Sequence, residues 1–206
     1  MNLSPPPHPV GLFPQFVKHK QPVSLCVRER KTLSNDFSIT NIDTDAVVLN
    51  VCGPKCGPQE RKEFSDANGN LLFTLLKEPY NIKDTFEVQD SNGKKLFCID
   101  SSSLIRIKLT ATYTNPMIQK DETIVLKGTF GQRKATITCG EAVIGRISRD
   151  IVDSKSILLD TRAYALNVAP NVDFALLAAF TVALDAKYDD GSFSEFITDV
   201  LEQDAP

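Results

Sequence analysis

Cysteines and histidines, the side chains that most often carry chemistry, rarely fall close together in this sequence. Cys52 and Cys56 are the closest pair of thiols, four residues apart in the segment Cys-Gly-Pro-Lys-Cys. Such a pair could bind a metal ion or form a regulatory disulfide. A structural zinc site needs four ligands, and neither a second close cysteine pair nor a nearby histidine is present. We therefore expect no metal and interpret the segment as a loop between strands, with a redox role as the alternative.

A catalytic nucleophile of the Ser-His or Cys-His type needs an imidazole beside it. The two histidines, His8 and His19, both fall in or beside the proline-rich start of the chain. Phosphate-binding loops, the nucleophile elbow and zinc-protease helices are missing from the sequence. Asp150, Asp153 and Asp160 could form a carboxylate pair, but acids outside strands are usually solvated. The sequence thus predicts neither a catalytic site nor a cofactor.

Charge and cysteine usage limit the class of protein. The 206 residues carry a formal net charge of -3, which gives no overall attraction to nucleic acid or anionic lipid. Any such binding has to be local. The sequence has no signal peptide, and its five cysteines do not form a secreted disulfide framework. We expect a cytoplasmic monomer with free, mostly buried thiols.

One apolar stretch, residues 171–187, is predicted to form the core around which the rest of the chain packs. From Phe174 to Leu184 its only polar residue is Thr181. A helix that is apolar on every side has no solvent face, and this one is shorter than the roughly 20 residues that span a bilayer. We therefore predict a buried helix whose charged ends reach water.

The ends and faces of this helix can be assigned from its residues. Asn171 is the predicted N-cap, and Asp173 lies in the first turn, where the helix dipole favours an anion. The alanines gather on one side, which we expect to be approached closely. The core-forming residues of this segment are Val172, Asp173, Phe174, Leu176, Leu177, Phe180 and Leu184.

The chain between the N-terminal segment and this helix reads as short strands separated by turns, a pattern typical of an all-β sandwich or barrel. Alternation is clearest over residues 104–109, Leu-Ile-Arg-Ile-Lys-Leu. The predicted strands are 23–30, 37–42, 46–52, 62–66, 71–76, 82–89, 95–100, 103–113, 122–130, 134–140, 142–148 and 157–169, the last of which could be two strands.

Two hairpin turns repeat at an offset of 24 residues. The segments 66–73 and 90–97 share Asp, Asn, Gly, Leu and Phe in register. Asn-Gly is typical of a type I′ turn, so we predict two successive hairpins of one meander.

About twelve strands and one apolar helix are most simply packed by closing the sheet around the helix. Closure removes the sheet edges. An eight-stranded barrel has room for little beyond its own side chains, whereas a larger one can enclose a helix of roughly 10 Å diameter.

The stretch Tyr-Ala-Leu-Asn-Val-Ala-Pro-Asn-Val-Asp-Phe-Ala over residues 164–175, together with the apolar run after it, resembles the C-terminal signature of the LURP-one-related family. The resemblance extends over about 34–187. These are tubby C-terminal-like proteins related to phospholipid scramblases, so the resemblance implies a mainly β fold, a closed antiparallel barrel of twelve strands around a central C-terminal helix. The packing argument gives the same fold.

The resemblance also implies a function. Tubby domains bind phosphoinositides through basic surface residues, and the matching candidates for an anionic lipid headgroup are Lys18, Lys20, Arg28, Arg30 and Lys31. Scramblases carry a proposed calcium segment that corresponds to residues 160–171, where only Asp160 is acidic, so calcium binding is not expected. We expect a non-enzymatic binding or scaffold module, cytoplasmic or peripheral at membranes, with an anionic membrane or a protein as partner. A scramblase-like membrane-active protein and a protein-binding module without lipid binding are the alternatives.

The chain divides into three parts. Residues 1–22 contain six prolines and should begin as a disordered or polyproline tail, with docking expected at Leu12, Phe13, Phe16 and Val17. Residues 23–190 form the barrel and its helix. Residues 191–206 are predicted to be a short amphipathic helix and tail outside the barrel.

Overall fold

The fold is a closed barrel of twelve antiparallel strands in the order β1-β12-β11-β10-β9-β8-β7-β6-β5-β4-β3-β2. It comes from a computed structural model that describes residues 3–30, 36–54, 60–78, 84–102, 107–129, 134–148 and 163–189. The predicted fold is confirmed. The strands are β1 Val23–Glu29, β2 Phe37–Asn41, β3 Val47–Cys52, β4 Arg61–Asp66, β5 Leu71–Lys77, β6 Thr85–Gln89, β7 Lys95–Ser101, β8 Ile107–Asn115, β9 Lys120–Thr129, β10 Lys134–Cys139, β11 Ala142–Ser148 and β12 Ala163–Val168.

The pairing of β1 with β12 closes the barrel. Leu25 of β1 lies opposite Leu166 of β12, and the two strands stay in register from Val23 to Arg28. The strand predicted over 157–169 begins within the described residues only at Ala163, because residues 149–162 lie outside them. Neighbours in sequence are neighbours in the sheet all the way round, so the barrel is an up-and-down meander.

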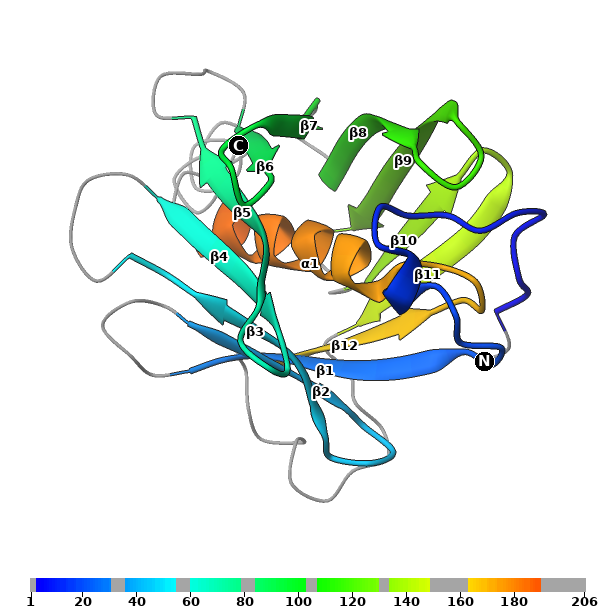
Figure 1. Ribbon diagram of the computed structural model, residues 1–206, viewed down its shortest axis with the longest axis horizontal. Coiled ribbons are helices and arrows are strands. Elements are labelled where there is room, and N and C mark those ends of the chain that lie inside the picture. Colours follow the sequence, from blue (N-terminus) through cyan, green and yellow to red (C-terminus); the bar gives the residue numbers. More distant parts are fainter. Residues whose placement is uncertain are drawn as a thin grey trace, which may run out of the picture.

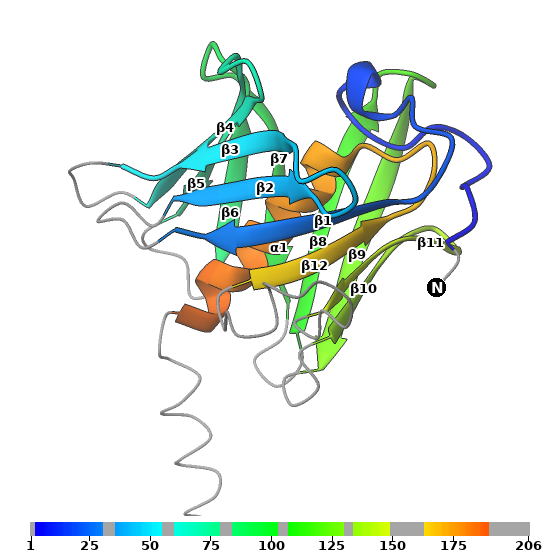
Figure 2. The ribbon, with the colours of Figure 1, turned by 90° about the horizontal axis from the view of Figure 1, so that it is seen from below.

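The helix α1, Phe174–Asp189, threads through the ring of strands (Figures 1 and 2). Leu177 and Phe180 are fully buried, as is Thr181, whose hydroxyl donates to the Leu177 carbonyl at 3.0 Å. This bond satisfies the one polar side chain in the middle of the helix. The prediction of a central buried helix is therefore confirmed for the part of the chain that the structure describes.

The side chain of Leu177 in α1 packs closely on Gly145 of β11. A Cβ atom at this position would lie 2.7 Å from Cδ1 of Leu177, which is closer than two carbon atoms can approach. A larger residue at this position would require the Leu177 side chain to move. The contact involves a leucine of the bulky face, and the close approach predicted for the alanine side stays a prediction.

The two repeated turns have the same geometry, but they are not type I′. Gly69 and Gly93 have positive φ values of 85° and 78°, whereas Asn68 and Asn92 do not. A type I′ turn requires positive φ at both central residues. In each turn the aspartate accepts hydrogen bonds from the backbone two and four residues later, and the strand register shifts beside it. A bulged turn with glycine in the left-handed position fits these observations.

The ends of the helix differ from the prediction that they reach water. Asp173 is completely buried, and Asp185 is 6% exposed. The Tyr164 hydroxyl donates to Asp185 at 2.6 Å, so this carboxylate is satisfied by protein instead of solvent. Phe174, predicted to belong to the core, is only half-buried.

The C-terminal helix predicted over 191–206 lies outside the described residues. Among the residues that are described, no helix has both the length and the apolar character needed to cross a bilayer.

The position of Phe180 generates a prediction about stability. Because its side chain is fully buried between helix and barrel, Phe180→Ala should lower the free energy of unfolding by about 3–5 kcal/mol, measured by urea denaturation. The matched control is Val47→Ala, at a site that is 39% exposed and should change stability by less than about 0.5 kcal/mol. Equal midpoints for Phe180→Ala and the wild type would contradict the central position of α1.

Candidate functional site

Residues 3–22 form a strap across the end of the barrel at which α1 begins (Figure 2). Val10 pairs with Val172 in a parallel bridge, and its N–H donates to the Asn171 carbonyl at 3.0 Å. The Asn171 N–H donates to the carbonyl of His19 at 3.1 Å. The strap is thus hydrogen-bonded to the loop that precedes the helix, and we call this end of the barrel the strap end.

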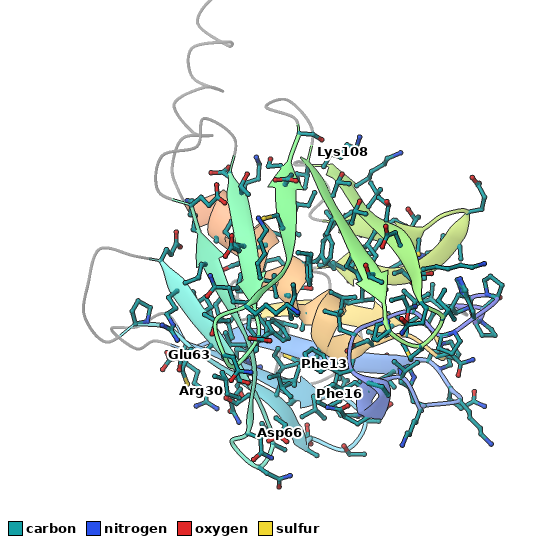
Figure 3. All side chains as sticks on the ribbon, turned by 45° about the horizontal axis from the view of Figure 1, so that its top comes forward. Phe13, Phe16, Arg30, Glu63, Asp66 and Lys108 are labelled. Carbon is teal, nitrogen blue, oxygen red and sulfur yellow. The ribbon has the colours of Figure 1, made fainter. Side chains whose placement is uncertain are left out.

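Aromatic rings fix the strap over the core. Phe13 stacks on Phe73 of β5 with ring centroids 5.7 Å apart, and Phe16 packs against Phe174 at 4.8 Å (Figure 3). These contacts agree with the docking predicted for this part of the segment, which includes Leu12 and Val17. The strap packs against the barrel earlier than predicted, however, because Leu3 is already buried at 5% exposure.

Asp173 joins the strap to the helix. Its Oδ2 accepts hydrogen bonds from the backbone N–H groups of Leu12 at 3.0 Å and Phe13 at 2.9 Å. Its Oδ1 accepts from the N–H groups of Ala175 at 2.9 Å and Leu176 at 3.2 Å. Burial raises the pKa of this carboxyl to about 6, while the four N–H donors oppose the shift. At neutral pH one buried carboxylate therefore caps α1 and holds the strap.

The N-cap predicted at Asn171 is wrong. Asp173 makes the capping bonds, because the helix begins at Phe174. Asn171 instead adopts a φ of 60°, a left-handed conformation that asparagine tolerates better than most residues. Gly11 completes the junction, since a Cβ atom there would lie 2.1 Å from Cβ of Asp173.

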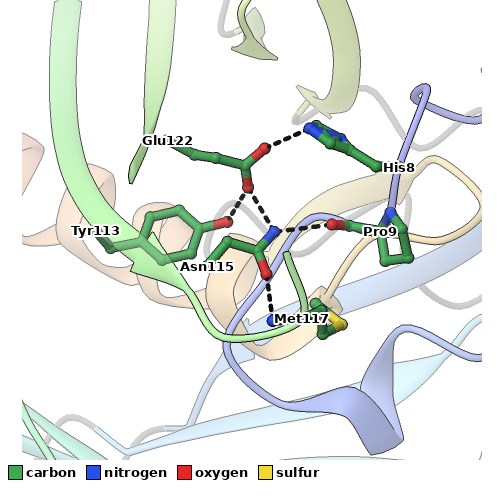
Figure 4. A network of polar contacts seen from close by, with 6 residues as sticks. All are labelled: His8, Pro9, Tyr113, Asn115, Met117 and Glu122. Carbon is green, nitrogen blue, oxygen red and sulfur yellow. Dashed lines mark hydrogen bonds and ion pairs between the residues drawn. The ribbon is translucent and has the colours of Figure 1, made fainter. Parts of the chain in front are cut away.

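A second buried carboxylate, Glu122 of β9, holds an earlier part of the strap, at His8 and Pro9 (Figure 4). Its Oε2 accepts from the hydroxyl of Tyr113 at 3.0 Å and from Nδ2 of Asn115 at 2.7 Å. The same Asn115 amide donates to the Pro9 carbonyl at 2.8 Å. Nε2 of His8 lies 3.1 Å from Oε1 of Glu122. Burial and the neighbouring carboxylate raise the pKa of the Tyr113 hydroxyl, which stays protonated as a donor.

A groove of about 640 Å³ lies beside this network, between the strap, the β8–β9 hairpin and the turn from β10 to β11. His8, Glu122 and Cys139 belong to its lining. Burial raises the pKa of the Cys139 thiol to about 12, and the charge of Glu122 adds to the effect. A protonated thiol is a poor nucleophile. The groove therefore lacks an activated nucleophile among its described residues, although His8 and Cys139 both line it.

Sequence reasoning missed this network, and only part of it could have been found. Glu122 has the same strand parity as Ile124 and Leu126, which point into the core, so alternation marks it as a buried acid in need of partners. His8 lies in a segment without periodicity. Its partner on β9 follows only from the path of the strap.

Of the cysteine and carboxylate candidates, Cys52 alone falls within the described residues, so the prediction of no metal at these positions stays a prediction. Cys52 is exposed, while Cys56 and the acids at 150, 153 and 160 lie outside the described residues. Ligand atoms of Glu78, Glu87 and Cys98 lie within 4.8 Å of one another. The ammonium of Lys95 lies 3.4 Å from Glu87 and supplies positive charge there.

The candidate lipid-binding cations fall into two groups. Lys18 and Lys20 are exposed on the strap. Arg28, half-buried, and Arg30, exposed, lie at the other end of β1, and a seven-residue strand spans about 20 Å. Lys31 lies outside the described residues. The structure therefore does not gather the five cations into one patch.

Comparison with known proteins gives consistent matches. A family model described as LURP-one-related matches residues 23–185. The Arabidopsis thaliana protein LURP-one-related 15 is 24% identical over 168 residues, covering 77% of this chain and 76% of its own length. LURP-one-related 1 from the same plant is 24% identical over 191 residues, covering 87% and 84%. The X-ray structure of an Arabidopsis thaliana protein superimposes with a TM-score of 0.63 at 19% identity, covering 87% of this chain and 99% of that one, which shows the shared fold.

The role of Asp173 can be tested by an isosteric change. Asp173→Asn replaces one acceptor oxygen by an amide group that cannot accept from the two backbone donors facing it. Each buried donor left without a partner costs about 1–3 kcal/mol, so we expect a loss of that order or more in urea denaturation. The control is Asp43→Asn on the exposed β2–β3 turn. An unchanged midpoint for Asp173→Asn would show that the carboxylate does not hold the strap.

The same carboxyl predicts a pH dependence. Its pKa is raised from 3.8 in the unfolded chain to about 6 in the folded protein, so between these values the folded state binds the extra proton. Stability contributed by this group is therefore present below about pH 4 and is lost as pH rises through about 6. The wild-type free energy of unfolding, minus that of Asp173→Asn, should fall by about 3 kcal/mol over this interval. A difference that stays constant or rises with pH would contradict the assignment.

Proposed function

Because the chain belongs to the LURP-one-related family, we propose that it is a non-catalytic binding module that acts through the outside of its barrel. The observation that carries the proposal is the filled interior. Leu177, Phe180 and Leu184 project from α1 into a core in which they are 0–3% exposed. Barrels that bind small ligands inside need an open cavity, and here the helix takes that space. A partner must then bind to outer side chains or loops.

The proposed partner is a lipid headgroup that carries phosphate. Arg28 and Arg30 lie together at the end of β1 away from the strap, and Lys31 follows Arg30 in sequence. Arginine pairs with phosphate oxygens through several N–H donors at once. Lys18 and Lys20 lie at the strap end and do not contribute to the same headgroup site.

A scramblase-like activity is less compatible with this arrangement. For α1 to insert in a bilayer, it would have to leave a core in which Ala175, Ala179 and Ala183 are as fully buried as the bulky residues. It would also have to break the four hydrogen bonds to Asp173. The proposal is therefore peripheral binding without insertion of the helix.

Liposome sedimentation tests the lipid partner. We expect the wild type to sediment with neutral vesicles that contain a few per cent phosphoinositide and to be released as salt is raised above the physiological range. The triple variant Arg28→Ala, Arg30→Ala, Lys31→Ala should lose at least tenfold in apparent affinity. The matched control is Lys18→Ala with Lys20→Ala, which removes cations at the other end of the barrel and should change the affinity by less than twofold.

Negligible sedimentation of every variant with every vesicle would contradict lipid binding. The surviving function would then be a protein-binding module.

A further inference from the structure

The outer face of β8–β11 carries cations in an arrangement that folding alone does not favour. Lys108 of β8 and Lys127 of β9 lie directly opposite each other in an antiparallel pair, and both are exposed. Cβ atoms of such a pair lie about 4.5–5.5 Å apart, and like charges in this position destabilise the sheet. Neither lysine forms an ion pair with any described residue.

Two more cations extend the array across the sheet. Thr136 of β10 lies between Lys127 of β9 and Arg146 of β11 in the strand register, and Lys134 is two residues from Thr136 on the same face. Lys134 is thus diagonal to both, at about 7–8 Å. We call Lys108, Lys127, Lys134 and Arg146 the basic surface. It covers three strand spacings, about 14 Å.

Acidic side chains are scarce on this face. The outward positions of β8–β12 that are described carry one acid, Asp121, which lies at the strap end of β9, six residues from Lys127. The nearest acid in register is Asp100 on β7, which lies opposite Thr110 of β8. The carboxylate of Asp100 already accepts a hydrogen bond from the Thr85 hydroxyl.

Several cations elsewhere on the described barrel wall have acids beside them. Arg61 lies 2.7 Å from Glu63, and Lys77 lies 3.5 Å from Glu60. In Figure 3, Glu63 lies on the opposite side of the view from Lys108. The exposed Lys108–Lys127 pair therefore differs in charge pattern from these cations.

We propose that the basic surface docks on a bilayer that contains anionic lipids. The inference rests on the proposed lipid-binding function and adds to the headgroup site at the end of β1 a second, electrostatic contact on β8–β11. Four cations spread over about 14 Å of the outer wall can contact several headgroups at once. Binding through the basic surface is then set by the charge density of the membrane, in addition to the headgroup site proposed at the end of β1.

The net charge of the protein gives this surface a second role. The whole chain carries -3, so an anionic membrane repels most orientations of the molecule. Each lysine or arginine within a Debye length of such a membrane strengthens binding to it. The basic surface is therefore expected to orient the barrel, with β8–β11 toward the lipid.

Charge reversal on one strand separates binding from folding. Lys127→Glu faces Lys108 and replaces a repulsive pair by an attractive one, so its melting temperature should be unchanged or higher. Its sedimentation with phosphatidylserine vesicles should fall at least tenfold, and further in the double variant Lys108→Glu, Lys127→Glu. The control is Lys94→Glu with Lys120→Glu, two exposed lysines at the turns of the strap end with the same total charge change, which should lose less than twofold.

The outcomes distinguish this inference from the function on which it rests. If the wild type binds and only the triple alanine variant at positions 28, 30 and 31 loses binding, the basic surface is not the docking face but lipid binding stands. If the wild type sediments with phosphoinositide but not with phosphatidylserine at equal membrane charge, a headgroup site overturns the charge-density account. If a DNA duplex releases the protein from vesicles when its phosphate concentration is tenfold below that of the vesicle lipid, nucleic acid replaces lipid as the partner. No binding to any vesicle overturns both proposals.

Discussion

The structure depends on the burial of a helix that has no polar face. Because α1 is apolar all round, its stability requires apolar contacts on every side. The described chain has no second α-helix to supply them, and its strands do so by closing around α1. Twelve strands close around it, and the absence of a side chain at Gly145 leaves room for Leu177. The same closure pairs every strand on both sides, so the described barrel presents no open sheet edge for another chain to extend.

Enclosing a helix creates a second requirement at its ends, where backbone groups lose their intrahelical partners. At the start of α1, Asp173 accepts from the first turn of the helix and from the strap. At its other end, Lys187 donates to Asp84 at 3.3 Å and to Ser101, and Asp185 accepts from Tyr164. Charged residues at the ends of the apolar run therefore serve as internal partners for buried polar groups, which leaves the outer face of the barrel as the surface for binding.

The sequence was sufficient for the fold but not for the contacts that depend on distant parts of the chain. The apolar run and the alternating strands predicted a barrel around a helix, because both patterns are local. The capping role of Asp173 was assigned to Asn171, since the helix start depends on where the strap lies. The basic surface was missed for a similar reason. Lys108 and Lys127 are 19 positions apart in sequence, and only the strand register places them side by side.

The central claim is that α1 stays enclosed while the outer wall binds. Amide hydrogen exchange of residues 174–187, measured with and without anionic vesicles, tests it most directly. We predict that these amides exchange only through global unfolding and that their protection is the same with vesicles present, while protection on β8–β11 increases. Rapid exchange of the helix, or a loss of its protection when vesicles are added, would show that α1 leaves the barrel and would contradict the account.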